Sequence, residues 1–147
     1  MPVDRIVIFG ILNIMLGLCI YTDYKDHKIY NNVVLPCIFL GFFFNSLFYG
    51  VEGFKSCCMS FGISLVFFLI FYLIHMMGAG DVKLVVAASV LTNVFYAFGA
   101  LIIGTILAAF YGTYVWMKTR NRKMRIPYGI FVGLGFYIYQ IGILILS

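Results

Sequence analysis

The chain has 147 residues, of which 64% are hydrophobic and 10% are charged, and its formal net charge is +5. A typical soluble domain is about half apolar and about a quarter charged, so this composition excludes a water-soluble globular protein and a disordered one. The basic balance does not indicate nucleic-acid binding, because that would need a basic face on a water-exposed module. The composition therefore predicts a protein that lies in a lipid bilayer.

The apolar stretches predict membrane-spanning helices. One span needs about 20 apolar residues, so a chain of this length has room for about six. The stretches are continuous rather than alternating, which disfavours a β-barrel. We therefore expect an all-α polytopic membrane protein, a bundle of about six transmembrane helices that forms one membrane-embedded domain over residues 1–147. The expected spans, in chain order, are 6–22, 32–49, 57–77, 84–91, 98–117 and 127–146.

Two connections between these spans are short. Residues 50–55 are expected to form a turn between the second and third spans. The next apolar stretch, 84–117, would make a helix of about 50 Å, which is too long for a hydrocarbon core of about 30 Å. The polar pair Thr92-Asn93 divides it into the fourth and fifth spans. An alternative fourth span extends to Tyr96 or lies partly in the membrane interface.

The basic residues predict the orientation of the chain. With six spans, the first, third and fifth loops lie on one side of the membrane and carry eight basic residues, whereas the other side carries two. Cytoplasmic loops are enriched in Lys and Arg, so we expect the odd loops to be cytoplasmic and both termini to lie outside. The eight are Lys25, Lys28, Lys83, Lys118, Arg120, Arg122, Lys123 and Arg125, and the two are Arg5 and Lys55.

Two of the acidic residues fall at span ends on this same side. Asp23 ends the first span and Asp81 precedes the fourth. Ionisable groups at membrane depth are costly and usually functional. Two carboxylates from separate helices near one membrane face suggest an aspartyl dyad, in which one is the general base on a water and the other, protonated, is the general acid. The alternative interpretation is that each aspartate only marks a helix end. The remaining acids, expected to be loop charges, are Asp4, Asp26 and Glu52.

The residues around Asp81 add to this hypothesis. Gly78 and Gly80 precede it, and glycine permits positive φ and close approach of the backbone, which leaves room for an extended substrate strand. Lys83 is expected to anchor the chain at the interface first, and to influence the dyad second. The dipoles of the two helices favour the protonated form of Asp23, at a helix C-terminus, and the charged form of Asp81, at an N-terminus. They predict that Asp23 more often carries the shared proton.

Three motifs resemble one protease family. The string Gly78-Ala79-Gly80-Asp81-Val82-Lys83-Leu84 resembles the GxGD signature of the type IV prepilin peptidases, the A24 family of membrane aspartyl proteases. Asp23, followed six residues later by Ile29-Tyr30-Asn31, resembles the family's first motif, with Tyr30 where the family usually has Pro. Ile126-Pro127-Tyr128-Gly129 resembles the Ile-Pro-aromatic opening of its last helix. The spacing selects Asp23 rather than Asp26, and Asn31 is a plausible N-cap for the second span.

The resemblance implies an activity and a place in the cell. It implies an Asp23/Asp81 dyad that activates water, in a site shaped by Gly78, Gly80, Lys83, Ile29 and Asn31. The implied substrate is the precursor of a pilin-like protein, whose short basic leader would be removed at the cytoplasmic face of a prokaryotic cell membrane. An aspartyl dyad needs no metal or organic cofactor, so none is expected. Longer family members carry paired CxxC motifs and methylate the new N-terminus, and we expect cleavage without methylation here.

Two other functions compete with this interpretation. A small transporter or channel could use Asp23 and Asp81 as proton or cation sites, although carrier sites tend to lie at the membrane midplane between structural repeats. A presenilin-like intramembrane peptidase also resembles GxGD, but such chains have about nine spans, too many for the room available here. Membrane lipid is the other expected partner, and the sequence does not predict an oligomeric state.

Overall fold

The computed structural model describes residues 3–26, 29–75, 77–120 and 128–146. Every regular element in these ranges is an α-helix, in the order α1 (Val3–Asp26), α2 (Asn31–Leu73), α3 (Ala79–Leu91), α4 (Val94–Thr119) and α5 (Tyr128–Leu146). Four of them, α1, α2, α4 and α5, are long and apolar enough to cross a membrane. The prediction of an all-α, multi-pass membrane protein is confirmed.

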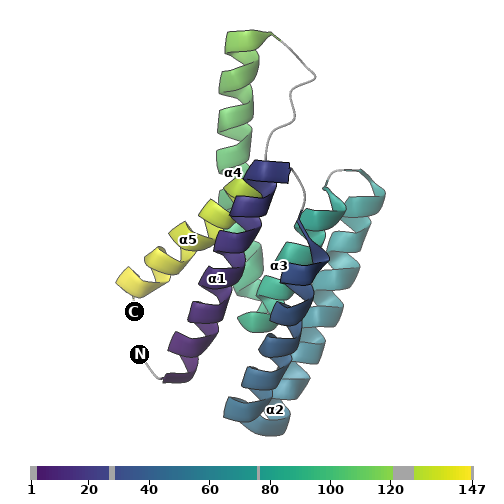
Figure 1. Ribbon diagram of the computed structural model, residues 1–147, viewed down its shortest axis with the longest axis vertical. Helices are drawn as coiled ribbons and strands as arrows, with labels where there is room; N and C mark the ends of the chain where they lie inside the picture. Colours follow the sequence, from purple (N-terminus) through teal and green to yellow (C-terminus); the bar gives the residue numbers. More distant parts are fainter. Residues whose placement is uncertain (1–2, 27–28, 76, 121–127, 147) are drawn as a thin grey trace.

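Helix α2 is a hairpin rather than one rod. Its backbone leaves the helical region at Gly50, with φ 60° and ψ −140°, and the residues before and after it form two antiparallel halves, as Figure 1 shows. This φ/ψ region is essentially restricted to glycine. The halves correspond to the predicted second and third spans. The turn expected over residues 50–55 is wrong in extent, because the chain reverses at Gly50 and is helical again from Val51.

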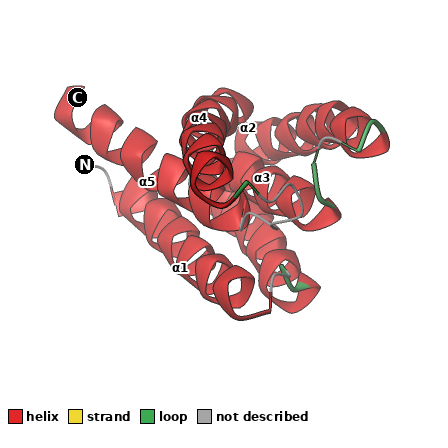
Figure 2. Cartoon of the chain, turned by 90° about the horizontal axis from the view of Figure 1, so that it is seen from above, coloured by secondary structure: helices red, strands yellow, loops and turns green. Residues whose placement is uncertain are grey.

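Helix α3 is short and lies inside the bundle. Its 13 residues extend about 20 Å, which is less than the hydrocarbon thickness, and it is buried from Val82 to Leu91 except at Lys83. The α3 helix packs against both halves of α2 (Figure 2). The start expected at residue 84 is wrong: the helix begins at Ala79, and its polar first turn includes Asp81, because the free N–H groups of a first turn favour an acid there.

Polar side chains hold α3 against α2 where water is scarce. Asn45 Nδ2 donates to the carbonyl oxygens of Gly41 at 2.9 Å and Val90 at 3.3 Å. Ser89 Oγ and Ser64 Oγ are 2.8 Å apart and hydrogen-bonded. Such bonds join helices in membranes, where apolar side chains gain little by leaving lipid. They keep the short α3 at a set height in the bundle.

Close glycine contacts hold α5 against α4. A Cβ at Gly135 would lie 2.5 Å from Ala100 O and from Gly104 N, so the backbones almost touch.

In Figure 1 the second half of α4 projects beyond the rest of the bundle, at the end where α1 stops. This end also holds the starts of α2, α3 and α5, and we call it the Asp end because Asp23 and Asp81 lie there.

Candidate active site

The Asp end of the bundle contains a cavity of about 500 Å³. The end of α1, the start of α2 and the start of α3 supply its walls. All seven residues that sequence reasoning singled out line it together, although they come from three separate segments. The lining residues are Asp23, Ile29, Tyr30, Asn31, Gly78, Ala79, Gly80, Asp81 and Lys83.

Asp23 is held by a neighbouring helix. It lies in the last turn of α1 and is 7% exposed. Its Oδ2 accepts a hydrogen bond from the backbone N–H of Ile130 at 3.2 Å. Ile130 is in the first turn of α5, where N–H groups have no partner within their own helix. The carboxylate of Asp23 therefore satisfies a donor that α5 leaves free.

Asp81 faces the same cavity from α3. It is partly buried and precedes the apolar part of α3, outside the membrane-spanning helices. The pKa of Asp81 is raised to about 6, mainly by burial and also by the charge of Asp23. A backbone hydrogen bond from Gly78 lowers this pKa and opposes both effects. Loss of solvation favours the neutral acid. This burial acts against the helix dipole, which was expected to favour the charged form of Asp81.

The two glycines before Asp81 act through close approach. Gly78 has φ −72°, and Gly50 is the only glycine with positive φ in the described part of the chain, so neither glycine before Asp81 adopts the positive φ that glycine permits. A Cβ at Gly80 would lie 3.1 Å from Ile29 Cβ, and one at Gly78 would lie 3.1 Å from Asp81 Oδ2. The absence of side chains lets the first turn of α3 pack against Ile29 and keeps the Asp81 carboxyl unobstructed.

Lys83 joins α3 to the start of α2. Its Nζ donates to Asn31 Oδ1 at 2.8 Å, across one wall of the cavity. The N-cap role expected for Asn31 is wrong: Tyr30 is the N-cap residue and makes no side-chain capping bond, while Asn31 is the first residue of the helix. The side chain of Asn31 accepts from Lys83 instead of from its own helix.

Some residues near the site were not identified from sequence. Tyr30, where the resembled family usually has Pro, donates through its hydroxyl to Asp26 Oδ2 at 3.1 Å, so Asp26, the last residue of α1, is exposed and also hydrogen-bonded. Ile130 carried no sequence signal. Its neighbour Gly129 did, as the end of the third motif, and a Cβ there would lie 2.9 Å from Asp23 Oδ2.

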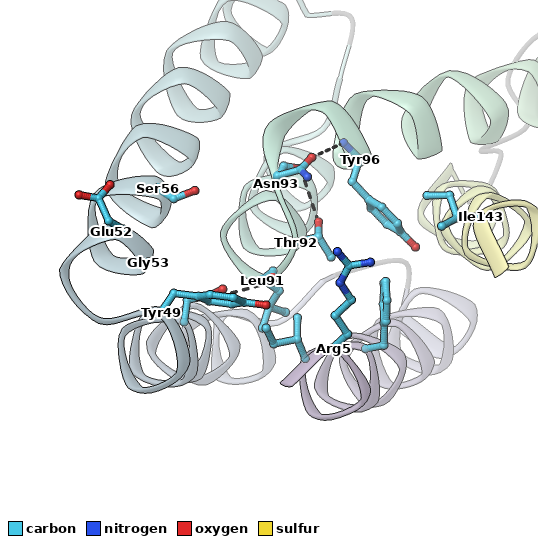
Figure 3. Close-up of a pocket in the computed structure, with 13 residues that line it drawn as sticks. Arg5, Tyr49, Glu52, Gly53, Ser56, Leu91, Thr92, Asn93, Tyr96 and Ile143 are labelled. Atoms are coloured by element: carbon cyan, nitrogen blue, oxygen red, sulfur yellow. Dashed lines mark hydrogen bonds between the residues drawn. The ribbon is translucent and has the colours of Figure 1, made fainter. Parts of the chain in front are cut away.

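A second cavity, of about 510 Å³, lies at the opposite end of the bundle. Figure 3 shows its labelled side chains coming from all five helices, with Arg5 of α1 extending toward Thr92 and Tyr96. Asn93 caps α4 there through a 2.7 Å bond from the Tyr96 N–H. Glu52 is the one acid among the described lining residues. This cavity therefore lacks the paired carboxylates of the Asp end.

No group of three or more His, Cys, Asp or Glu side chains that could hold a metal ion occurs in the ranges that the structure describes. The Asp end presents two carboxyls that face one cavity from different surroundings. Such a pair can take a proton from water and give a proton to a carbonyl oxygen.

Comparison with known proteins gives one match. The sequence profile of the type IV leader peptidase family matches residues 10–113, well over half of the chain. The matched range includes every lining residue of the Asp-end cavity and excludes α5. No curated protein and no solved structure matches the chain.

Proposed function

This chain belongs to the type IV leader peptidase family, and we propose that it is an aspartic endopeptidase that removes the leader of pilin-like precursors at the cytoplasmic membrane face. The observation that carries the proposal is that Asp23 and Asp81, from separate helices, line one cavity at one end of the bundle. The family match favours a peptidase over the transporter or channel alternative. A peptidase whose cavity is lined by two carboxyls, with no Ser, Thr or Cys among the described lining residues, is best explained as an aspartic one.

The reaction uses one water molecule. One carboxylate takes a proton from the water as its oxygen attacks the scissile carbonyl carbon, and the other carboxyl gives its proton to the carbonyl oxygen. The resulting gem-diol then returns a proton to the dyad, the amide nitrogen takes one, and the C–N bond breaks. The products are a free carboxyl on the leader and a free amine on the mature protein.

Orientation follows from charge and supports the proposed side of cleavage. Lys25 lies in the last turn of α1 and Lys118 in the last turn of α4, and both helices end on the side of the bundle where the Asp end lies, whereas Arg5 and Lys55 belong to the opposite end (Figure 1). The positive-inside rule then assigns the Asp end to the cytoplasm. A precursor that enters the membrane by its apolar helix would present the leader junction to the cavity.

The test is leader removal by the reconstituted full chain. Asp23→Asn and Asp81→Asn are each expected to lower the cleavage rate by about 100-fold or more, because each removes a proton-transfer group. Asp4→Asn is the matched control, since it makes the same change at the opposite end of the bundle. Asp26→Asn tests whether Asp23, rather than Asp26, is the aspartate of the first motif. Both controls are expected to cleave within a few-fold of the wild type. Normal cleavage by a folded Asp23→Asn or Asp81→Asn chain would refute the dyad.

A further inference from the structure

The contact between α5 and α1 depends on two glycines of α5, spaced four apart. A Cβ at Gly133 would lie 2.7 Å from Ile20 Cδ1, and one at Gly129 would lie 2.9 Å from Asp23 Oδ2 and 3.0 Å from its Cγ. Small residues at this spacing let two membrane helices approach closely. Here the close approach places the carboxyl of Asp23 directly on the backbone of the first turn of α5.

The same turn supplies a hydrogen-bond donor to that carboxyl. The Ile130 N–H bonds to Asp23 Oδ2 at 3.2 Å, at the positive end of the α5 dipole. The turn is also tied to α4, because the Tyr128 hydroxyl and Thr105 Oγ1 are 2.8 Å apart and hydrogen-bonded. The donor is therefore held in place from two sides. A backbone N–H accepts no proton, so it stabilises the carboxylate form of its partner.

The other groups facing the two acids do not reverse this asymmetry. On α1, the buried thiol of Cys19 lies close enough to Asp23 to interact with it electrostatically. On α5, Tyr128 interacts with Asp81 in the same way. On α3, the ammonium of Lys83 is bonded to Asn31. Asp81 also accepts a backbone hydrogen bond from Gly78, which lowers its pKa, but burial is the larger effect and raises that pKa.

We propose that the first turn of α5, Gly129 and Ile130, positions Asp23 as the proton-accepting carboxylate of the dyad and thereby leaves Asp81 as the proton donor. This inference rests on the proposed aspartic peptidase function. It assigns a part in the site to a helix that lies outside the matched family region. It also reverses the sequence prediction that Asp23 more often carries the shared proton, because that prediction considered the dipoles of α1 and α3 but not that of α5.

The first test reads the protonation state without substrate. Infrared spectra of the full chain with isotope-labelled aspartate, recorded at about pH 5, are expected to contain a protonated-carboxyl band that disappears in Asp81→Asn and remains in Asp23→Asn. A band that instead disappears only in Asp23→Asn would overturn the proposal. Because no cleavage is measured, this result is separate from success or failure of the proposed peptidase activity.

The second test perturbs the first turn of α5. Gly129→Ala is expected to shift the Asp23 carboxylate band and to lower kcat for leader removal by about tenfold, with KM changed by less than about twofold. Gly142→Ala is the matched control, because Gly142 lies in the same helix and a Cβ added there would meet nothing within 4 Å. Replacing Ile130 by its α-hydroxy acid removes the donor N–H while keeping the side chain, and is expected to shift the same band. An unchanged Asp23 band in both variants would refute the proposed role.

Discussion

Replacing Asp23 by Asn should lower the pKa of Asp81 and leave it above the ordinary value for an aspartate. Two causes raise this pKa from 3.8 to about 6: burial is the larger and the charge of Asp23 the smaller. The whole shift corresponds to about 3 kcal/mol of differential interaction between the charged and neutral forms. Asp23→Asn removes the smaller cause and keeps the burial.

The sign can be followed through the pH range. In the wild type, Asp81 holds its proton up to about pH 6, so leader removal that needs Asp81 as an acid should decline as the pH rises through that value. In Asp23→Asn the proton should leave at a lower pH. The assay is an infrared titration of isotope-labelled aspartate in micelles, with Asp26→Asn as the control. An unchanged Asp81 titration would mean that the two carboxyls do not interact, and a fall to about 3.8 would mean that burial is not the leading cause.

Three further predictions concern the bundle and its connections. Gly50→Ala should destabilise the chain by about 1–3 kcal/mol, because Gly50 has φ 60° in a region of backbone conformation that is essentially restricted to glycine. In thermal unfolding, the control Gly62→Ala, whose new Cβ would meet open space, should change the melting temperature little, and equal melting temperatures for the two variants would contradict a strained turn at Gly50. Lys83→Met should lower cleavage about threefold by losing the Asn31 bond, and adding Asn31→Ala should cost less than the product of the single effects; fully independent effects would mean that the bond has no role. Glu52→Cys should react with a membrane-impermeant maleimide from outside the cell, and labelling only after the membrane is opened would reverse the orientation.

Several site residues could be predicted because their motifs are local. Gly78, Gly80, Asp81 and Lys83 lie within six consecutive positions, and hydropathy alone placed them just before a buried helix. The pairing of Asp81 with Asp23 needed one more step, the alternation of loops across a membrane, which depends only on the number of spans. The seven residues singled out from the sequence therefore line one cavity, whereas their individual contacts were not predicted and their roles in catalysis stay a prediction.

Contacts between distant segments were not predictable in the same way. The N-cap role of Asn31 was a local expectation, and Lys83, which lies 52 positions away in the sequence, took the Asn31 side chain instead. Tyr30 departs from the family pattern, which usually has Pro at this position, and in the structure its hydroxyl donates a hydrogen bond to Asp26. Each outcome was decided by which partner the fold brings near.

The sequence by itself determined that this is an all-α membrane protein with two aspartates at one face. That much follows from composition and local pattern, because in lipid each helix must satisfy its own backbone hydrogen bonds and can be recognised one span at a time. Only the tertiary structure decided that the chain reverses at Gly50 alone, that α3 lies buried against α2, and that Ile130 donates to Asp23. These depend on packing between helices, where the loss of one Cβ or the end of a neighbouring dipole sets the surroundings of a carboxyl.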